Sequence, residues 1–208
     1  DEERHAVAEK LARFTGLSKE YVLRANLRVP MWRFGKELLR DRGETVGRYD
    51  SRYTGIDVDS VGDSAEYDAS AEAIFGPFTA AINDYLRHDL KVNDDHVYEV
   101  LTDQVQPWSY GRNISRFPDA SNTLRQSMSA QPFMKLFVAT GNYDLATPPA
   151  TAKYSVEHMR LQPHLQKNID FHTYAGGHMM YVYEPSMVQL RKDIEAFYGS
   201  ALKADANE

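Results

Sequence analysis

The sequence predicts an α/β protein in which helices cover a small parallel sheet. Residues 134–139 form a short apolar run that ends in Thr140-Gly141, and residues 168–174 alternate between apolar and polar side chains. Both patterns are typical of strands. A segment with helical periodicity follows each of them, so the order is strand, helix, strand, helix. Units of this kind form parallel sheets with helices on the faces.

Residues 1–105 precede this unit and are predicted to be mostly helical. Apolar residues spaced i, i+4, i+7 form a first helix that Gly16 ends. Ser18 is a predicted N-cap for the second helix. Pro30 begins a third, and Gly43 terminates it.

Three further segments complete the first half. Residues 44–56 carry glycines and aromatics typical of a hairpin or extended turn, and the acidic residues 57–68 predict an exposed loop. A helix is expected from about residue 71 to 90, with Phe78 and Tyr85 facing inward. We therefore expect a mostly helical region over residues 1–110 and a separate strand–helix segment over residues 111–208.

Within that second segment, the pattern places each element as follows. Residues 112–133 are polar and interrupted by prolines, and they show no buried strand. Pro148-Pro149 begins the helix that follows the first strand. Pro185 begins the last helix, in which Met187, Leu190, Ile194 and Phe197 are expected to face inward.

Composition argues against several classes of protein. The net charge is −6 and no basic stretch occurs, which gives nucleic-acid binding little electrostatic support. No apolar run approaches the roughly 20 residues that span a bilayer. The chain has no cysteine, so disulfides, thiolate metal sites and cysteine nucleophiles are excluded. We expect no cofactor and no metal, because the aspartates at 57, 59 and 63 lack calcium-loop spacing and its terminal glutamate.

Two residues at the ends of the predicted strands are candidates for catalysis. Asp144 follows the first strand and His178 follows the second. Working residues of open α/β sheets lie just beyond the carboxyl ends of strands. A carboxylate there can orient an imidazole and stabilise its protonated form. Taken singly, Asp144 is better explained as a turn cap and His178 as a loop residue, but the pair occurs in the acid-then-histidine order of α/β-hydrolases.

The segments around both residues resemble those of the serine carboxypeptidase family. The acid-bearing segment of that family is similar to residues 138–144 (VATGNYD) with Thr147-Pro148, and its histidine segment to residues 175–179 (AGGHM) with Glu184-Pro185. Weaker similarity to bacterial members extends over VGRYDSRYTG at residues 46–55, GPFT at 76–79 and WSYG at 108–111.

The resemblance implies the C-terminal part of an α/β-hydrolase sheet, preceded by a helical cap. It implies that Asp144 is the triad acid, that His178 is the general base and acid, and that Met179 lines a substrate pocket. Plain core packing explains Met179 equally well. The expected substrate is a peptide cut at its C-terminal bond through an acyl-enzyme, and a secreted or periplasmic location is favoured.

The nucleophile of such an enzyme is missing from the sequence. No Gly-x-Ser-x-Gly motif occurs, and Ser109 has neither a leading strand nor enough intervening structure to replace it. We therefore expect the chain to work with an N-terminal half of the same protein and to be inactive alone. Two other hypotheses stay open: a non-catalytic interaction module that retains Asp144 and His178, and an acyltransferase of the same fold.

Overall fold

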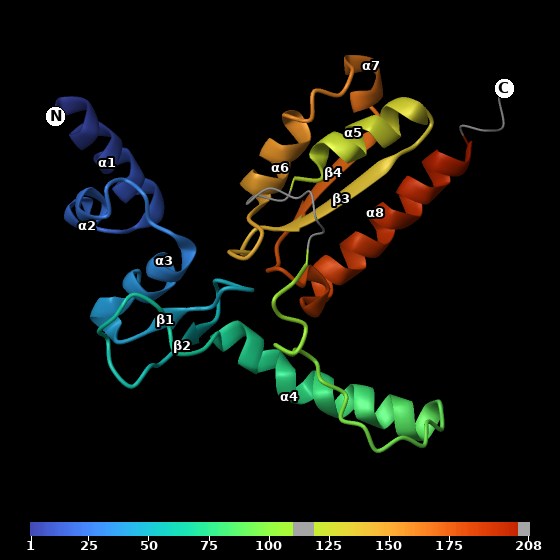
Figure 1. Cartoon of the computed structure of the whole chain (residues 1–208), viewed down its shortest axis with the longest axis horizontal. Helices are drawn as coiled ribbons and strands as arrows, with labels where there is room; N and C mark the ends of the chain where they lie inside the picture. The colour runs from blue at the N-terminus through green and yellow to red at the C-terminus, as the bar shows by residue number, and fades with distance from the viewer. Residues whose placement is uncertain (110–118, 204–208) are drawn as a thin grey trace. The chain divides into compact units, whose positions relative to one another are not determined.

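A computed structural model describes residues 1–109 and 119–203 of the chain (Figure 1). The chain divides into two compact units, each described by itself. Unit 1 comprises Asp1–Pro77 and Tyr143–Ala146, and unit 2 comprises the remainder. Helices combined with small sheets agree with the general α/β class. The expected boundary near residue 110 falls outside the described residues and stays a prediction.

The sequence correctly indicates where the first helix of unit 1 ends and where the second and third begin, but the third ends at Glu37, before the Gly43 terminator that was expected for it. α1 (Glu2–Thr15) ends at Gly16, whose φ is 78°, and the Ser18 hydroxyl accepts a hydrogen bond from the Tyr21 amide at the start of α2 (Lys19–Arg24). α3 (Met31–Glu37) starts directly after Pro30. The core of these helices consists of Ala8, Leu17 and Val22, surrounded by Leu11, Tyr21, Leu23, Leu27, Val29, Phe34 and Leu38.

The predicted hairpin is also confirmed. A 3-10 helix, η1 (Arg40–Arg42), leads into β1 (Thr45–Val46), which pairs antiparallel with β2 (Thr54–Gly55). α4 (Ala69–Asp84) continues as one π-helical turn, η2 (Tyr85–Asp89). The inward orientation expected for two of its aromatics is wrong, because Phe78 is 40% exposed and Tyr85 is 49% exposed.

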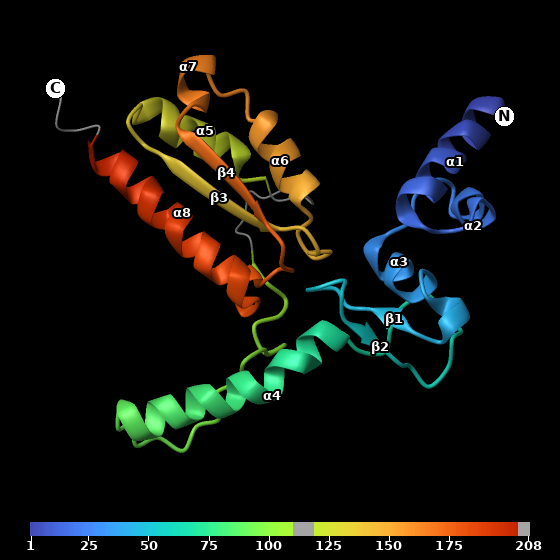
Figure 2. The same cartoon turned by 180° about the vertical axis from the view of Figure 1, so that it is seen from behind.

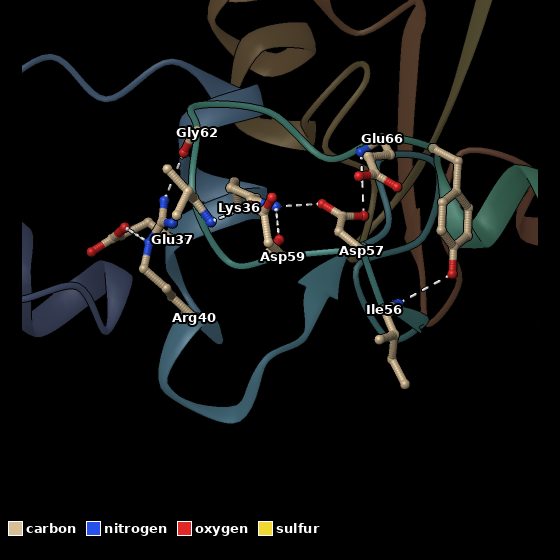
Figure 3. Close-up of polar contacts among 10 residues, drawn as sticks. Lys36, Glu37, Arg40, Ile56, Asp57, Asp59, Gly62 and Glu66 are labelled. Atoms are coloured by element: carbon tan, nitrogen blue, oxygen red, sulfur yellow. Dashed lines mark hydrogen bonds and ion pairs between the residues drawn. The ribbon is translucent and has the colours of Figure 1, made fainter.

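The acidic segment 57–68 is held against α3 more firmly than an exposed loop would be. The Lys36 ammonium donates hydrogen bonds to Asp57 Oδ2 at 2.5 Å and to the Asp59 carbonyl at 2.8 Å (Figure 3). The side chains of Lys36 and Asp57 are only 3% and 2% exposed. Arg40 donates to the Gly62 carbonyl, and Arg33 binds Asp63. The expectation of an exposed loop is therefore wrong at Asp57, which pairs with a cation on the helix.

Unit 2 contains the predicted parallel strand pair. β3 (Leu136–Gly141) and β4 (Ile169–Tyr174) pair in parallel, with Leu136 opposite Ile169 and Gly141 opposite Tyr174. Helices cover both faces of this ribbon in Figures 1 and 2. Leu136 and Ile169 pack beneath α5 (Ser121–Ala130) and α6 (Pro149–Glu157). On the opposite face, the Phe137 ring meets Phe197 of α8 (Glu184–Lys203) with centroids 5.3 Å apart.

The helices of unit 2 include one that the sequence patterns did not predict. α5 (Ser121–Ala130) lies within the polar segment 112–133, for which no element was predicted, and its Met128 is among the most deeply buried side chains. α6 (Pro149–Glu157) and α8 (Glu184–Lys203) start where the prolines predict, and a short α7 (Pro163–Gln166) precedes β4. Met187, expected to face inward, is 47% exposed. No helix within the described ranges has the length and apolar character required to cross a membrane.

A polar cluster joins β4 to α8 on the face opposite α5. The Tyr174 hydroxyl donates to Asp193 Oδ2 at 2.9 Å, and His172 Nδ1 lies 3.4 Å from the same oxygen. Burial by itself raises the pKa of Asp193, but hydrogen bonds from Tyr174 and Gln189, with the charges of His172 and Lys192, outweigh it and lower the pKa overall.

This cluster predicts a loss of stability in acid. A carboxyl group whose pKa is depressed in the folded chain stabilises the fold above its unfolded pKa, and that contribution disappears as the pH falls through the folded pKa. We therefore expect the stability difference between the native chain and Asp193→Asn to shrink as the pH falls from about 5 to about 2. Urea unfolding across that range measures it. Glu195→Gln, at an exposed pair with Arg191, is the control, and a pH-independent difference would contradict the prediction.

Candidate active site

The histidine-bearing loop packs directly across the end of β3. A Cβ atom at Gly141 would lie 2.0 Å from the Gly177 carbonyl oxygen and 2.6 Å from that of Gly176. Real Cβ atoms do not approach backbone that closely, so only glycine fits at position 141. The Asn142 amide donates to the Tyr174 carbonyl at 2.9 Å, which ties the residue after β3 to the end of β4. The two strand ends therefore form one sheet edge.

His178 lies at this edge, exposed to solvent. Its Nδ1 atom is 3.1 Å from the hydroxyl oxygen of Thr147, the residue that precedes the prolines of α6. Which of the two atoms donates the hydrogen depends on the tautomer of the ring. Met179 follows in a half-buried position, and its predicted role in a substrate pocket stays a prediction.

Asp144 lies in the four-residue segment 143–146, which belongs to unit 1. Its side chain is buried, with the residue 4% exposed, and Oδ1 accepts a hydrogen bond from the Ala146 amide at 2.7 Å. Through this hydrogen bond the carboxylate binds the backbone two residues later in the chain, which closes a tight turn. The interpretation of Asp144 as a turn cap is therefore confirmed by this contact.

A second turn, residues 48–52, holds the segment that carries Asp144. The Leu145 amide donates to the Arg48 carbonyl at 3.0 Å, and the Ser51 amide donates to the Tyr143 carbonyl at 2.9 Å. The guanidinium of Arg52 lies over the Tyr143 ring at 4.6 Å, a cation–π contact. A side-chain hydrogen bond with Asp50 raises the pKa of Arg52, which stays charged.

Two polar side chains near the start of α4, Asp68 and Ser70, hold the 48–52 turn through hydrogen bonds to its backbone. The Ser70 hydroxyl oxygen accepts hydrogen bonds from the amides of Tyr49 and Asp50 at 3.0 and 3.1 Å. Asp68 Oδ1 accepts from the Arg48 amide at 3.0 Å and from the Ser70 hydroxyl. Neither periodicity nor a motif predicted a role for these positions. The resemblance of residues 46–55 to the insertion region of bacterial serine carboxypeptidases, itself a prediction, was the signal that could have drawn attention to this turn.

The predicted site residues are thus distributed over both units. Asp144 belongs to unit 1, whereas His178 and Met179 belong to unit 2. Ser109 is exposed, and Tyr110 and Gly111 of the same WSYG stretch lie outside the described residues. Within residues 1–109 and 119–203, no group of three histidines or carboxylates is arranged to hold a metal ion.

The chain was compared with protein families, curated proteins and solved structures. No protein-family model matches the chain, and no curated protein or solved structure gives a significant match. The resemblance to serine carboxypeptidases therefore stays a prediction from short sequence segments, of which those around Asp144 and His178 are the most specific.

Proposed function

We propose that the chain supplies the acid and the base of a serine-type carboxypeptidase of the α/β-hydrolase fold. In this proposal Asp144 orients and stabilises the imidazole of His178, and His178 moves the proton. The observation that carries the proposal is the sheet edge where β3 and β4 end side by side, with His178 on the loop packed against Gly141. The carboxyl ends of parallel strands are where such folds keep their catalytic groups.

In this proposal His178 keeps its own hydrogen on Nδ1 and directs it to Asp144. The unprotonated Nε2 then takes the proton of the serine hydroxyl as that oxygen attacks the peptide carbonyl. The same nitrogen returns the proton to the leaving amine as the peptide bond breaks. The hydroxyl oxygen of Thr147 lies 3.1 Å from Nδ1 and helps to orient the ring. The serine itself and the oxyanion donors are expected in residues that the coding sequence places before Asp1.

The test combines sequence and kinetics. Upstream coding sequence should contain a Gly-x-Ser-x-Gly segment, and the longer product should hydrolyse blocked dipeptides at the C-terminal bond. In that product His178→Gln should lower kcat by at least about 10³-fold, because the general base is lost. His158→Gln is the matched control, since His158 stacks on Tyr154 at the end of α6. Native turnover in His178→Gln would refute the assignment.

A further inference from the structure

Unit 1 contains a cleft whose lining combines apolar walls with one carboxylate. The cleft has a volume of about 230 Å³ and lies between α3, β1 and the segment 64–68. Its apolar and aromatic walls come from Met31, Trp32, Val46 and Tyr67. Asp68 and Arg48 are the only ionisable lining residues apart from the Tyr67 phenol. The lining therefore suits a ligand with an apolar stem and one charged end.

Asp68 has a carboxylate oxygen that the fold does not use. Its structural hydrogen bonds, from the amides of Arg48 and Ser70 and from the Ser70 hydroxyl, all end on Oδ1. Oδ2 is buried and accepts no hydrogen bond from any described residue. An asparagine would serve the three structural contacts equally well, because its carbonyl oxygen is the same acceptor. A buried carboxylate oxygen without a partner calls for a donor from elsewhere.

The aromatic walls are arranged to receive a cation. Trp32 is 55% exposed although it stands on a helix, so its ring is available to a ligand. The Tyr67 hydroxyl accepts a hydrogen bond from the Ile56 amide at 3.1 Å, which fixes the second ring in place. Indole and phenol faces attract ammonium and guanidinium groups. The guanidinium of Arg48, the other charged group of the lining, is 5.4 Å from the ring centroid of Tyr49, a cation–π contact that engages it within the fold.

We infer that this cleft binds the side chain of a lysine or arginine in a peptide. The aliphatic stem would lie along Met31 and Trp32, and the cationic end would meet Asp68. The cleft is also adjacent to the candidate acid, because the Arg48 backbone bonds Asp68 through its amide and Leu145 through its carbonyl. Its assignment as a subsite for the substrate, and hence a preference for basic peptides, rests on the proposed peptidase function.

Fluorescence tests the inference on the 208-residue chain. A Trp108→Phe variant leaves Trp32 as the only tryptophan, because the sequence contains two. We expect the peptide acetyl-Ala-Lys-Ala-amide to change its emission and to bind about tenfold more tightly than the norleucine analogue, which lacks the charge. Asp68→Asn should remove that preference, whereas Asp63→Asn, which breaks an ion pair with Arg33 outside the cleft, should retain it.

Other outcomes would overturn the inference. Equal binding of the lysine and norleucine peptides, or a lysine preference that survives Asp68→Asn, would exclude recognition by that carboxylate. Tighter binding of a glutamate peptide would show that Arg48 selects an anion instead. If Asp68→Asn misfolds by circular dichroism, Trp32→Ala measured by calorimetry takes its place, and unchanged lysine affinity there has the same meaning.

The binding assay also separates this inference from the proposed function. It requires no hydrolysis, so lysine binding together with native turnover in His178→Gln would leave a cation-binding cleft without the proposed catalytic base. Loss of turnover in His178→Gln with no lysine binding would overturn the cleft assignment alone.

Discussion

Replacing Gly141 by alanine should destabilise unit 2 by at least about 3 kcal/mol. The added methyl group would lie 2.0 Å from one backbone oxygen and 2.6 Å from another. Backbone cannot rotate out of the way as a side chain can, so the histidine loop would have to leave the end of β3. The same change should abolish turnover in the longer product, because His178 is carried by that loop.

Thermal and urea unfolding of the 208-residue chain measure the effect. Gly199→Ala provides the comparison, since Gly199 lies on α8 with open space around its missing Cβ. There an alanine should stabilise the chain by about 0.5–1 kcal/mol through helix propensity. Similar unfolding curves for Gly141→Ala and the native chain would show that the loop does not pack against β3 as described.

The second large effect is expected at the buried ion pair of unit 1. Lys36→Met removes the cation that faces Asp57 and leaves a buried carboxylate without its partner (Figure 3). Loss of one member of such a pair typically costs about 3–5 kcal/mol, because the remaining charge is desolvated. The segment 57–66 should detach from α3 as a result, since the Glu66 amide is bound by the other oxygen of Asp57.

A double variant distinguishes charge burial from simple loss of contacts. Lys36→Met combined with Asp57→Leu replaces both charges with apolar groups and should recover most of the lost stability. Lys19→Met is the surface control, because its pair with Glu9 is exposed and contributes less than about 1 kcal/mol. Urea unfolding followed by tryptophan emission reports all of these variants. A double variant no more stable than Lys36→Met would contradict the proposed origin of the effect.

Local sequence patterns predicted the elements whose formation depends on contacts within a few residues. Gly16 and Ser18 end and begin helices through contacts within a few residues, and the short apolar run before Gly141 predicted a strand that the structure shows as half-buried. The parallel pairing of β3 with β4 followed from the intervening helix, because a crossover brings the second strand back in the same direction. These features need no knowledge of distant residues.

The failures concern contacts between residues far apart in the sequence. Asp57 was expected in solvent because its neighbours are acidic, but its partner Lys36 lies 21 residues earlier. α5 was missed because its composition is polar and only Met128 is fully buried. The support of the Asp144 segment by Arg48 and Ser51 joins residues more than 90 positions apart, and periodicity cannot detect such a contact.

The residues 143–146 have a consequence for any attempt to dissect the protein. They lie between β3 and α6 of unit 2 in the sequence, yet they cluster with unit 1. A truncation after Pro77 would yield a first fragment without Asp144, and the second fragment would carry that aspartate without the 48–52 turn that holds it. Acid and histidine can therefore be kept in their described surroundings only when one uninterrupted polypeptide runs through both units.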